Sequence, residues 1–351
     1  MLTDRHPAAT PPAFMDRAVL TGEGRIETRR GPLPPVAEGE LLVRVLATGI
    51  CGSDLATYRG THPYKSAPCV LGHELCGTVV TGAGGFAPGD LVCSAAYAHC
   101  DACERCAEGR THLCTGKRNL CHLGWDGSFA EYVTLRTTMV HRLPAATDPV
   151  LGALVEPLSI AAHAVALAGP PGRRALRIIG AGNIGLGCLI AARRLGFGRI
   201  VCSDLGPEKG ERALALGADA YLDVLAGETG PEPADPGADA VLVASGHPGA
   251  VDEAVRVVRP GGTVVVVSFF DRPPTVAVNA LVGKEVRVIG SSLSTAGDFR
   301  RVIGWLTEGS VDPMPMVTHR FGLSEASVAM ALMAAGEPAT GKIIIIPRGD
   351  A

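Results

Sequence analysis

The first half of the chain contains two sets of residues of the types that bind metals. The first set is four closely spaced cysteines, Cys100, Cys103, Cys106 and Cys114. A short loop with this spacing can wrap one tetrahedral zinc ion with four sulfur ligands, which leaves no open position and so predicts a structural role. An iron–sulfur cluster also takes four cysteines and is the alternative metal centre.

The second set combines a thiol, an imidazole and two carboxylates, from Cys51, His73, Glu74 and Glu156. Each of these residues alone is more often part of a protein core. Glu156 stands among apolar residues, and a buried carboxylate needs a partner, which a metal ion would provide. Three protein ligands plus one exchangeable position are typical of catalytic zinc. Such a metal lowers the pKa of a hydroxyl group that it binds, and an ionised alcohol gives up hydride readily.

A glycine-rich turn, Gly180-Ala-Gly182-Asn183-Ile184-Gly185, follows a predicted strand and opens a predicted helix. In that context the glycines allow a tight turn, close approach of a pyrophosphate and close packing of helix on strand. Asp204 ends the next predicted strand, where its carboxylate can accept hydrogen bonds from an adenosine ribose, with Lys209 near the same ribose. No arginine follows Asp204 closely, which favours NAD over NADP. A structural turn and a helix-capping aspartate are the alternatives.

The elements that position these residues show two patterns. Up to about residue 155, short apolar runs such as 40–46 are interrupted by Gly and Pro, as in a β-rich domain. From there to about residue 291, strand candidates alternate with helical segments, which predicts a parallel sheet with crossover helices. The expected fold class is therefore α/β, with a β-rich domain followed by a doubly wound nucleotide-binding domain.

Composition argues against several classes of protein. Hydrophobic residues make up 47% of the chain, too many for a disordered protein. The net charge of −3, without a basic block, disfavours nucleic acid and anionic membranes as partners. The chain shows no apolar run of membrane-spanning length and no signal peptide, and its 11 cysteines fit metal ligation in a reducing compartment. We therefore expect a cytoplasmic location.

These motifs, in this order, resemble the zinc-dependent medium-chain dehydrogenase/reductase family, and most closely its polyol (sorbitol) and threonine dehydrogenase branch. The resemblance extends from about residue 15 to 347. It is carried by the four-cysteine loop and by residues 49–54, 72–74, 127–132, 156–158, 180–185, 216–219 and 341–343. Residues 51–60 are also similar to dehydrogenases that act on aminocyclitols.

The resemblance implies a domain plan. A GroES-like β-barrel catalytic domain comprises residues 15–160 and 297–351, with a structural zinc lobe at about 97–117. A Rossmann NAD-binding domain comprises residues 161–296, and residues 1–14 form a flexible tail. The family also implies a homodimer or homotetramer, with residues 286–289 near a contact at the sheet edge, and two zinc ions and NAD as cofactors.

The resemblance also implies roles for individual residues. Catalytic zinc would be held by Cys51, His73 and either Glu74 or Glu156. Asp54 would accept from the ring N–H of His73, and Ser53 would bind the substrate oxygen and pass its proton outward. Many relatives have a histidine two residues after the Asp54 position, whereas this chain has Ala56, so the outer end of the proton relay is open.

Nicotinamide contacts and the substrate follow from the same resemblance. The nicotinamide would contact Val267, Ser268, Phe269, Ser291, Ser292 and Leu293. Pocket candidates, with ordinary packing as an equal alternative, are Tyr58, His62, Trp125 and Phe269. The expected substrate is a small secondary alcohol or its ketone: a polyol, cyclitol, aminocyclitol or sugar. A simple secondary alcohol, a vicinal diol or a 3-hydroxy amino acid is the runner-up, and a non-catalytic structural or binding protein is a remote alternative.

Overall fold

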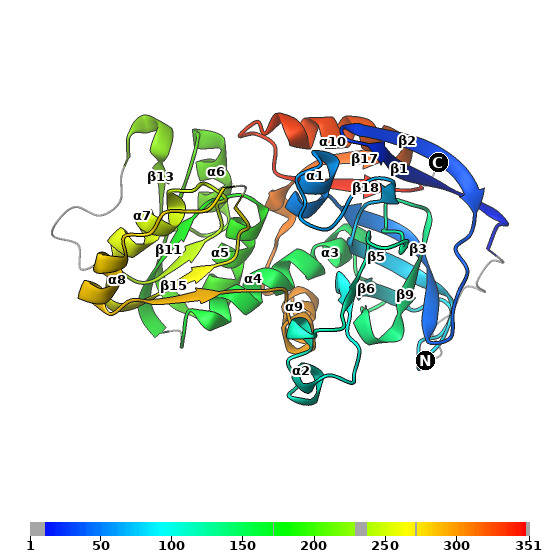
Figure 1. The fold of residues 1–351 in the computed structure, drawn as a ribbon, viewed down its shortest axis with the longest axis horizontal. Helices are drawn as coiled ribbons and strands as arrows, with labels where there is room; N and C mark the ends of the chain where they lie inside the picture. The colour runs from blue at the N-terminus through cyan, green and yellow to red at the C-terminus, as the bar shows by residue number, and fades with distance from the viewer. Residues whose placement is uncertain (1–10, 171, 229–236, 271, 349–351) are drawn as a thin grey trace. The chain divides into compact units, whose positions relative to one another are not determined.

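The computed structural model describes residues 11–170, 172–228, 237–270 and 272–348 (Figure 1). Contacts divide the chain into two units, Met1–Glu156 with Val317–Ala351, and Pro157–Met316. We call them unit 1 and unit 2. Most of the expected N-terminal tail lies outside the described residues, and the first strand already begins at Phe14.

Unit 1 is built mainly from antiparallel strands. Its strands are β1 (Phe14–Gly22), β2 (Arg25–Pro32), β3 (Glu40–Gly49), β4 (Cys69–Val70), β5 (Glu74–Thr81), β6 (Leu91–Ser94), β7 (Tyr97–Ala98), β8 (Arg118–Asn119), β9 (Tyr132–Arg136), β10 (Val140–Arg142), β17 (Val317–Gly322) and β18 (Lys342–Ile346). Its helices are α1 (Gly52–Tyr58), α2 (Glu104–Ala107), α3 (Pro149–Ala153) and α10 (Ala326–Ala335). Single 3-10 turns occur at Thr111–Leu113, Thr137–Met139 and Leu323–Glu325.

Strand β3 is the centre of unit 1. It belongs to a seven-stranded sheet in which six strands follow the order β10-β6-β5-β3-β18-β17 and the seventh, β9, pairs with β3 off this path. Most side chains of β3 are buried. The buried Leu and Val residues of β3 and the isoleucine run of β18 suit a strand covered on both faces. As a result, the start of β18 reaches the end of β3, although almost 300 residues separate them in the sequence.

Unit 2 is a parallel α/β unit. Its elements are α4 (Val155–Leu167), which begins at the unit boundary, β11 (Gly172–Ile179), α5 (Asn183–Leu195), β12 (Phe197–Asp204), α6 (Pro207–Ala215), β13 (Ala220–Asp223), β14 (Ala238–Val243), α7 (Ala250–Val257), β15 (Val258–Val266), α8 (Val278–Lys284), β16 (Arg287–Gly290) and α9 (Ala296–Thr307), with 3-10 turns at Val224–Ala226 and Met314–Met316. The strand order is β13-β12-β11-β14-β15-β16 and all neighbours are parallel. Helices connect successive strands, as the alternating sequence pattern predicts.

The unit boundaries differ from the expected 160/161 and 296/297. The second boundary lies at Met316/Val317, because helix α9 belongs to unit 2. Within that unit, Asp298 of α9 bonds the ring of His163 at 3.0 Å, and Glu308 pairs with Arg194 of α5 at 3.1 Å. No motif or residue spacing in the sequence indicates this tertiary packing. In the described part of the chain, no helix is both long enough and apolar enough to span a bilayer.

Candidate active site

Gly49, the last residue of β3, lies where three strands meet. The register pairs it with Glu74, the first residue of β5, and with Ile344 of β18. A Cβ atom on Gly49 would overlap Oε2 of Glu74 and would lie 2.7 Å from Cε of Lys342. The absent side chain therefore leaves the space in which Glu74 and Lys342 form a buried ion pair.

Lys342 is a residue of this site that the sequence-based prediction does not include. Its side chain is fully buried, and Nζ donates to the carbonyl oxygen of Ile50 at 2.9 Å while it pairs with Glu74. A buried ammonium needs such partners because an unpaired buried charge is costly. The sequence feature that could have indicated this residue is a lysine directly before a run of isoleucines, in a predicted strand whose other side chains are typical of a buried core.

The start of helix α1 positions Cys51 and Asp54. Cys51 is the N-cap residue, and its backbone N–H donates to Oδ2 of Asp54 at 3.0 Å. The other oxygen of Asp54 accepts from the N–H of Gly72 at 3.2 Å and lies 3.6 Å from Nδ1 of His73. The buried carboxylate therefore ties the start of α1 to the segment before β5, and it faces the imidazole of His73.

Burial and charge act in opposite directions on this pair. Burial by itself would raise the pKa of Asp54, but the imidazole of His73 holds that pKa below its ordinary value. Burial also disfavours protonated His73, yet the carboxylate of Asp54 and the thiol of Cys51 raise the pKa of His73 well above its ordinary value. A metal ion bound to this ring must compete with a proton.

Cys51, His73 and Glu74 bring three ligand atoms together within 4.8 Å of one another. His73 and Glu74 are buried and Cys51 is half-buried. A thiolate, an imidazole and a carboxylate form a donor set that suits zinc, so these residues fit the metal. Glu156 lies outside the set but is buried near it; burial, with the charge of Glu74 adding to the effect, raises the pKa of Glu156 to about 7.

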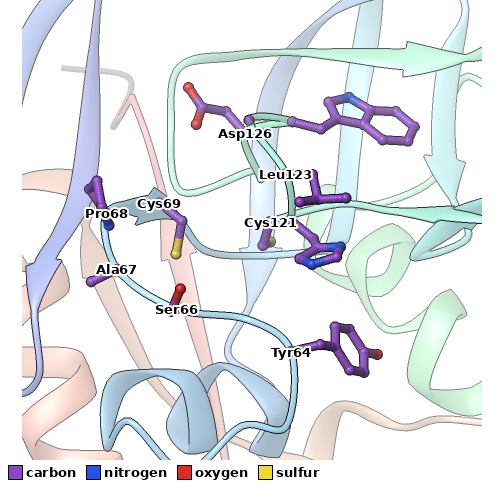
Figure 2. A pocket seen from close by; sticks show the side chains of 11 residues that line it. Tyr64, Ser66, Ala67, Pro68, Cys69, Cys121, Leu123 and Asp126 are labelled. Carbon is purple, nitrogen blue, oxygen red and sulfur yellow. The ribbon is translucent and has the colours of Figure 1, made fainter.

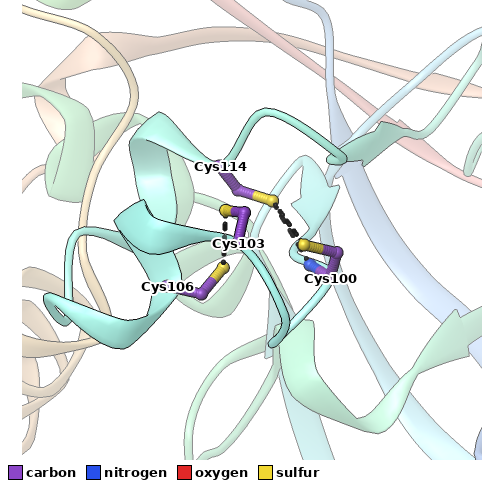
Figure 3. A group of neighbouring side chains, drawn as sticks. All are labelled: Cys100, Cys103, Cys106 and Cys114. Carbon is purple, nitrogen blue, oxygen red and sulfur yellow. Dashed lines mark hydrogen bonds between the residues drawn. The ribbon is translucent and has the colours of Figure 1, made fainter.

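The four-cysteine loop forms a second convergence of ligands, and Figure 3 shows its sulfur atoms gathered around one centre. The Sγ atoms of Cys103 and Cys106 are 3.6 Å apart, and those of Cys100 and Cys114 are 3.4 Å apart. Tetrahedral zinc with four sulfurs needs separations of roughly 3.8 Å. Backbone N–H groups of Thr115 and Cys106 lower the pKa of Cys103 to about 5, which favours a thiolate ligand.

A pocket of about 250 Å³ in unit 1 is lined by Tyr64 and by residues 66–69 and 121–126 (Figure 2). Trp125 lines it and donates from Nε1 to the carbonyl oxygen of Thr134 at 2.9 Å. His62 contacts Tyr64, which lines the pocket, with ring centroids 4.5 Å apart. Tyr58 instead packs against the core, and Phe269 lies in unit 2 with its side chain almost fully exposed. The pocket also includes Cys121, which the sequence-based prediction lacks.

Unit 2 places the glycine-rich turn at the end of β11 and the start of α5. Gly180 has a φ of 102°, and Gly182 is the N-cap residue of α5, ahead of Asn183 and Ile184. A Cβ atom on Gly185 would overlap the carbonyl oxygen of Gly180. The turn therefore requires glycine at its first position for conformation and at its third for packing.

Asp204, the last residue of β12, faces this turn. Its Oδ2 accepts from the N–H of Ala181 at 2.7 Å, and its Oδ1 accepts from Nζ of Lys209 at 2.8 Å and from the N–H of Leu205 at 2.7 Å. The structure thus brings together the glycine-rich turn, Asp204 and Lys209, which the sequence predicted at one site.

The two expected nicotinamide-contacting segments follow neighbouring strands. Val266 pairs with Gly290 at the carboxyl-terminal ends of β15 and β16, so residues 267–269 and 291–293 both follow these strands at the same end of the sheet. The backbone N–H of Val267 donates to the carbonyl oxygen of Val243 at 3.0 Å, and the backbone N–H of Ser291 donates to the carbonyl oxygen of Val266 at 2.8 Å. These segments and the glycine-rich turn all follow the carboxyl ends of parallel strands, where open α/β sheets bind ligands.

Comparison with known proteins matches both units. Residues 37–145 match the alcohol dehydrogenase GroES-like domain, and residues 183–308 match the zinc-binding dehydrogenase family. The chain is 34% identical to L-galactonate-5-dehydrogenase of Escherichia coli (strain K12) over 84% of this chain and 87% of that protein. It is 32% identical to sorbitol dehydrogenase of Halalkalibacterium halodurans over 93% of this chain and 97% of that protein.

A solved zinc-binding dehydrogenase from Sinorhizobium meliloti 1021, bound to NADP, superimposes with a TM-score of 0.88 and is 30% identical, covering 96% of this chain and 100% of that one. The chain belongs to the zinc-dependent medium-chain dehydrogenase/reductase family. The expected fold, a GroES-like domain and a Rossmann sheet, is confirmed. As a member of this family, the protein is a zinc-dependent NAD(P) dehydrogenase that acts on alcohols or polyols.

In this zinc-dependent dehydrogenase the structure brings Cys51, His73 and Glu74 together in one place and the four cysteines in another. Sequence reasoning missed Lys342 and Cys121, whose positions beside these residues depend on tertiary contacts. Cys121 is buried, and its Sγ donates to the carbonyl oxygen of Gly72 at 3.3 Å. Its sulfur also lies within 4.8 Å of ligand atoms of Asp54 and His73. No spacing pattern links Cys121 to these residues, so only the fold reveals the contact.

Proposed function

We propose that this dehydrogenase transfers hydride between NAD and a secondary hydroxyl group of a polyhydroxylated substrate, such as a polyol, cyclitol, aminocyclitol or sugar. The observation that carries the proposal is the convergence of Cys51, His73 and Glu74 within 4.8 Å. A donor set with one thiolate, one imidazole and one carboxylate leaves a fourth position for an exchangeable ligand. A closed, purely structural zinc site would not need that position.

In this proposal Cys51, His73 and Glu74 would hold the catalytic zinc, with the buried Glu156 close to them. Bound zinc supplies Lewis acidity, which lowers the pKa of an alcohol and polarises a ketone in the reverse reaction. The carboxylate of Asp54 lies 3.6 Å from Nδ1 of His73, and a small shift of either group would let it accept from that ring N–H and hold the tautomer of His73. Lys342 neutralises Glu74 and fixes the direction of its carboxylate.

Ser53 moves the substrate proton. It lies in the first turn of α1, two residues after Cys51, and its hydroxyl has no hydrogen-bond partner among the described residues. That hydroxyl is therefore free to accept the proton of the substrate alcohol while it donates its own. Ser53→Ala should lower turnover by roughly 10²- to 10⁴-fold with zinc content unchanged. Unchanged turnover would remove Ser53 from the relay.

We propose NAD rather than NADP as the cofactor. The carboxylate of Asp204 would repel a 2′-phosphate, and no arginine follows it closely. Lys209 offsets part of that charge, so the preference should be finite. The measurement is kcat/KM with each cofactor. Asp204→Ser should shift the ratio towards NADP, and an unshifted ratio would assign the discrimination to other residues.

We also propose a second, structural zinc at the four cysteines. Metal analysis of the purified protein should find about two zinc ions per chain, together with NADH formation from polyols, aminocyclitols or simple secondary alcohols. The best substrate among these separates the proposed class from the runner-up, a simple secondary alcohol or 3-hydroxy amino acid. Iron in place of zinc would instead indicate an iron–sulfur centre.

We further propose that two copies associate through β16. It is the last strand of the six-stranded sheet, and Val288 on it and Val282 on α8 are exposed. An exposed strand edge offers backbone groups to a second copy, and a two-fold axis would satisfy both edges. Light scattering should give a dimer or tetramer mass, and Val288→Pro should shift it towards the monomer. A single-chain mass for the unmodified protein would refute the proposal.

A further inference from the structure

Lys65 is a largely buried lysine whose ammonium has no hydrogen-bond or ion-pair partner among the described residues. Only 7% of the residue is exposed, and it lies in the loop between α1 and β4. Its backbone N–H donates to Nδ1 of His62 at 3.1 Å, but its ammonium has no hydrogen bond or ion pair with any described residue. The other four lysines, Lys117, Lys209, Lys284 and Lys342, each donate to an oxygen of the protein.

The surroundings of Lys65 keep it charged. Burial would lower the pKa of Lys65, but the thiol of Cys121 and the carboxylate of Asp54 outweigh it and raise that pKa above its ordinary value. Asp54 attracts the ammonium through space, but no hydrogen bond or ion pair joins the two groups; the bonds that Asp54 does accept come from the N–H groups of Cys51 and Gly72. A charged group with three N–H donors therefore remains near the candidate zinc site without an acceptor from the protein.

His62 supplies a second donor in the same loop. Its Nδ1 accepts from the backbone N–H groups of Lys65 at 3.1 Å and Tyr64 at 3.4 Å. Burial and the charge of Lys65 lower the pKa of His62 to about 4, so the ring is neutral at neutral pH. Because Nδ1 is an acceptor, the ring proton resides on Nε2, which has no hydrogen-bond partner among the described residues.

We propose that Lys65 and His62 form an anion-recognising subsite that binds a carboxylate of the substrate, next to the hydroxyl group that reacts. The substrate is then a hydroxy acid of the sugar-acid class. A carboxylate provides both the acceptors and the negative charge that this pair lacks, and bonds of this kind are stronger than neutral ones. An aminocyclitol would instead bring a second ammonium towards Lys65. The inference rests on the proposed function and narrows its substrate class.

The test compares acids with the neutral polyols of the same carbon skeleton. With zinc-loaded enzyme and NAD, L-galactonate is paired with galactitol and L-gulonate with sorbitol. We expect each acid to have the higher kcat/KM. Lys65→Met should raise KM for the acids by roughly 10- to 100-fold and change KM for the polyols by less than about threefold. Lys65→Arg, which keeps the cation, should restore part of the loss.

Two further variants sharpen the comparison. His62→Ala removes only the neutral donor, so it should raise KM for the acids by roughly fivefold to tenfold. Arg44→Met removes one positive charge from an exposed position of β3 and should leave both KM values unchanged. If Arg44→Met matched Lys65→Met, the effect would be one of net charge and the subsite would be refuted.

Failure of the subsite and failure of the proposed function have different signatures. Oxidation of the polyols in preference to the acids, with equal effects of Lys65→Met on both, would overturn the subsite alone. Absence of turnover with every alcohol would overturn the proposed function. In that case, calorimetric titration of L-galactonate into the zinc-loaded protein with NADH still decides the subsite. Binding that weakens in Lys65→Met supports it, and binding that is absent or unchanged by that variant overturns it.

Discussion

Unit 1 and unit 2 prepare their sites in different ways. In unit 1, charged side chains from four separate segments converge in a buried place: Asp54, His73 with Glu74, Glu156, and Lys342. In unit 2, the site is largely backbone, formed by one glycine-rich turn and the ends of neighbouring parallel strands. The first arrangement depends on long-range pairing, whereas the second is encoded within a short stretch of sequence.

This difference predicts different sensitivities. A buried cluster of charges is stable only when each member keeps its partner, so removal of one group should affect metal binding, turnover and folding together. A site formed by backbone groups should tolerate most side-chain substitutions. It should lose ligand binding only where an added side-chain atom would overlap a neighbouring atom. Variants in each unit can therefore test whether the two sites are separable.

The largest effect is expected from removal of a metal ligand in unit 1. Cys51→Ala should lower turnover by roughly 10³-fold or more and remove about one zinc ion per chain, because the Lewis acid is lost. Binding of NADH, measured by fluorescence, should persist because it belongs to unit 2. Cys93→Ala, at a buried thiol outside the metal sets, is the matched control. Loss of NADH binding in Cys51→Ala would show that the sites are not separable.

Loss of the buried cation should destabilise the protein strongly. In zinc-free protein, Lys342→Met leaves the carboxylate of Glu74 buried without its partner and the carbonyl of Ile50 without a donor, which should cost about 3–5 kcal/mol in the free energy of unfolding. Urea unfolding measures the change. The double variant Glu74→Gln with Lys342→Met should recover part of it. If the double variant were less stable than the single one, the charge-pair explanation would be wrong.

A methyl group in the glycine-rich turn should disable unit 2 selectively. Gly185→Ala places Cβ against the carbonyl oxygen of Gly180, so the turn must open and the dissociation constant for NADH should rise roughly tenfold or more. Zinc content should stay unchanged. Gly304→Ala, inside helix α9 with open space around it, is the control and should stabilise the helix by up to about 1 kcal/mol. Equal effects of both changes would contradict the steric argument.

The smallest effect concerns the buried carboxylate of unit 2. Burial opposes ionisation of Asp298, but hydrogen bonds from His163 and Thr295 lower its pKa to about 2. Because the folded pKa lies below the unfolded one, Asp298 stabilises the fold above about pH 4, by about 2 kcal/mol, and loses this effect as the pH falls towards 2. The variant Asp298→Asn should lack this stabilisation. Urea unfolding at pH 7, 4 and 3 should therefore show that the difference in free energy of unfolding between the two proteins shrinks as the pH falls. A difference that stays constant would refute the assignment.

Residue spacing in the sequence was enough to predict a site wherever its functional atoms come from one short segment of the chain. The spacing of Cys100 to Cys114 predicted a loop with four converging sulfurs, and the structure has it. The glycine-rich turn, with Asp204 at the end of the following strand, was predicted at one site, and the bonds of Ala181 and Lys209 to Asp204 unite it. In both cases the chain between the residues is too short or too regular to place them elsewhere.

Only the tertiary structure decided the rest. The strand register brought Lys342 to Glu74, and the fold of the loop after α1 buried most of Lys65 without giving its ammonium a hydrogen-bond or ion-pair partner among the described residues. Helix α9 packs within unit 2 through Asp298 and His163, so this contact-defined unit continues to Met316. These outcomes depend on which distant strands pair and which side chains are left without partners. Residue spacing within one segment does not carry that information, because pairing is decided by packing of the whole core.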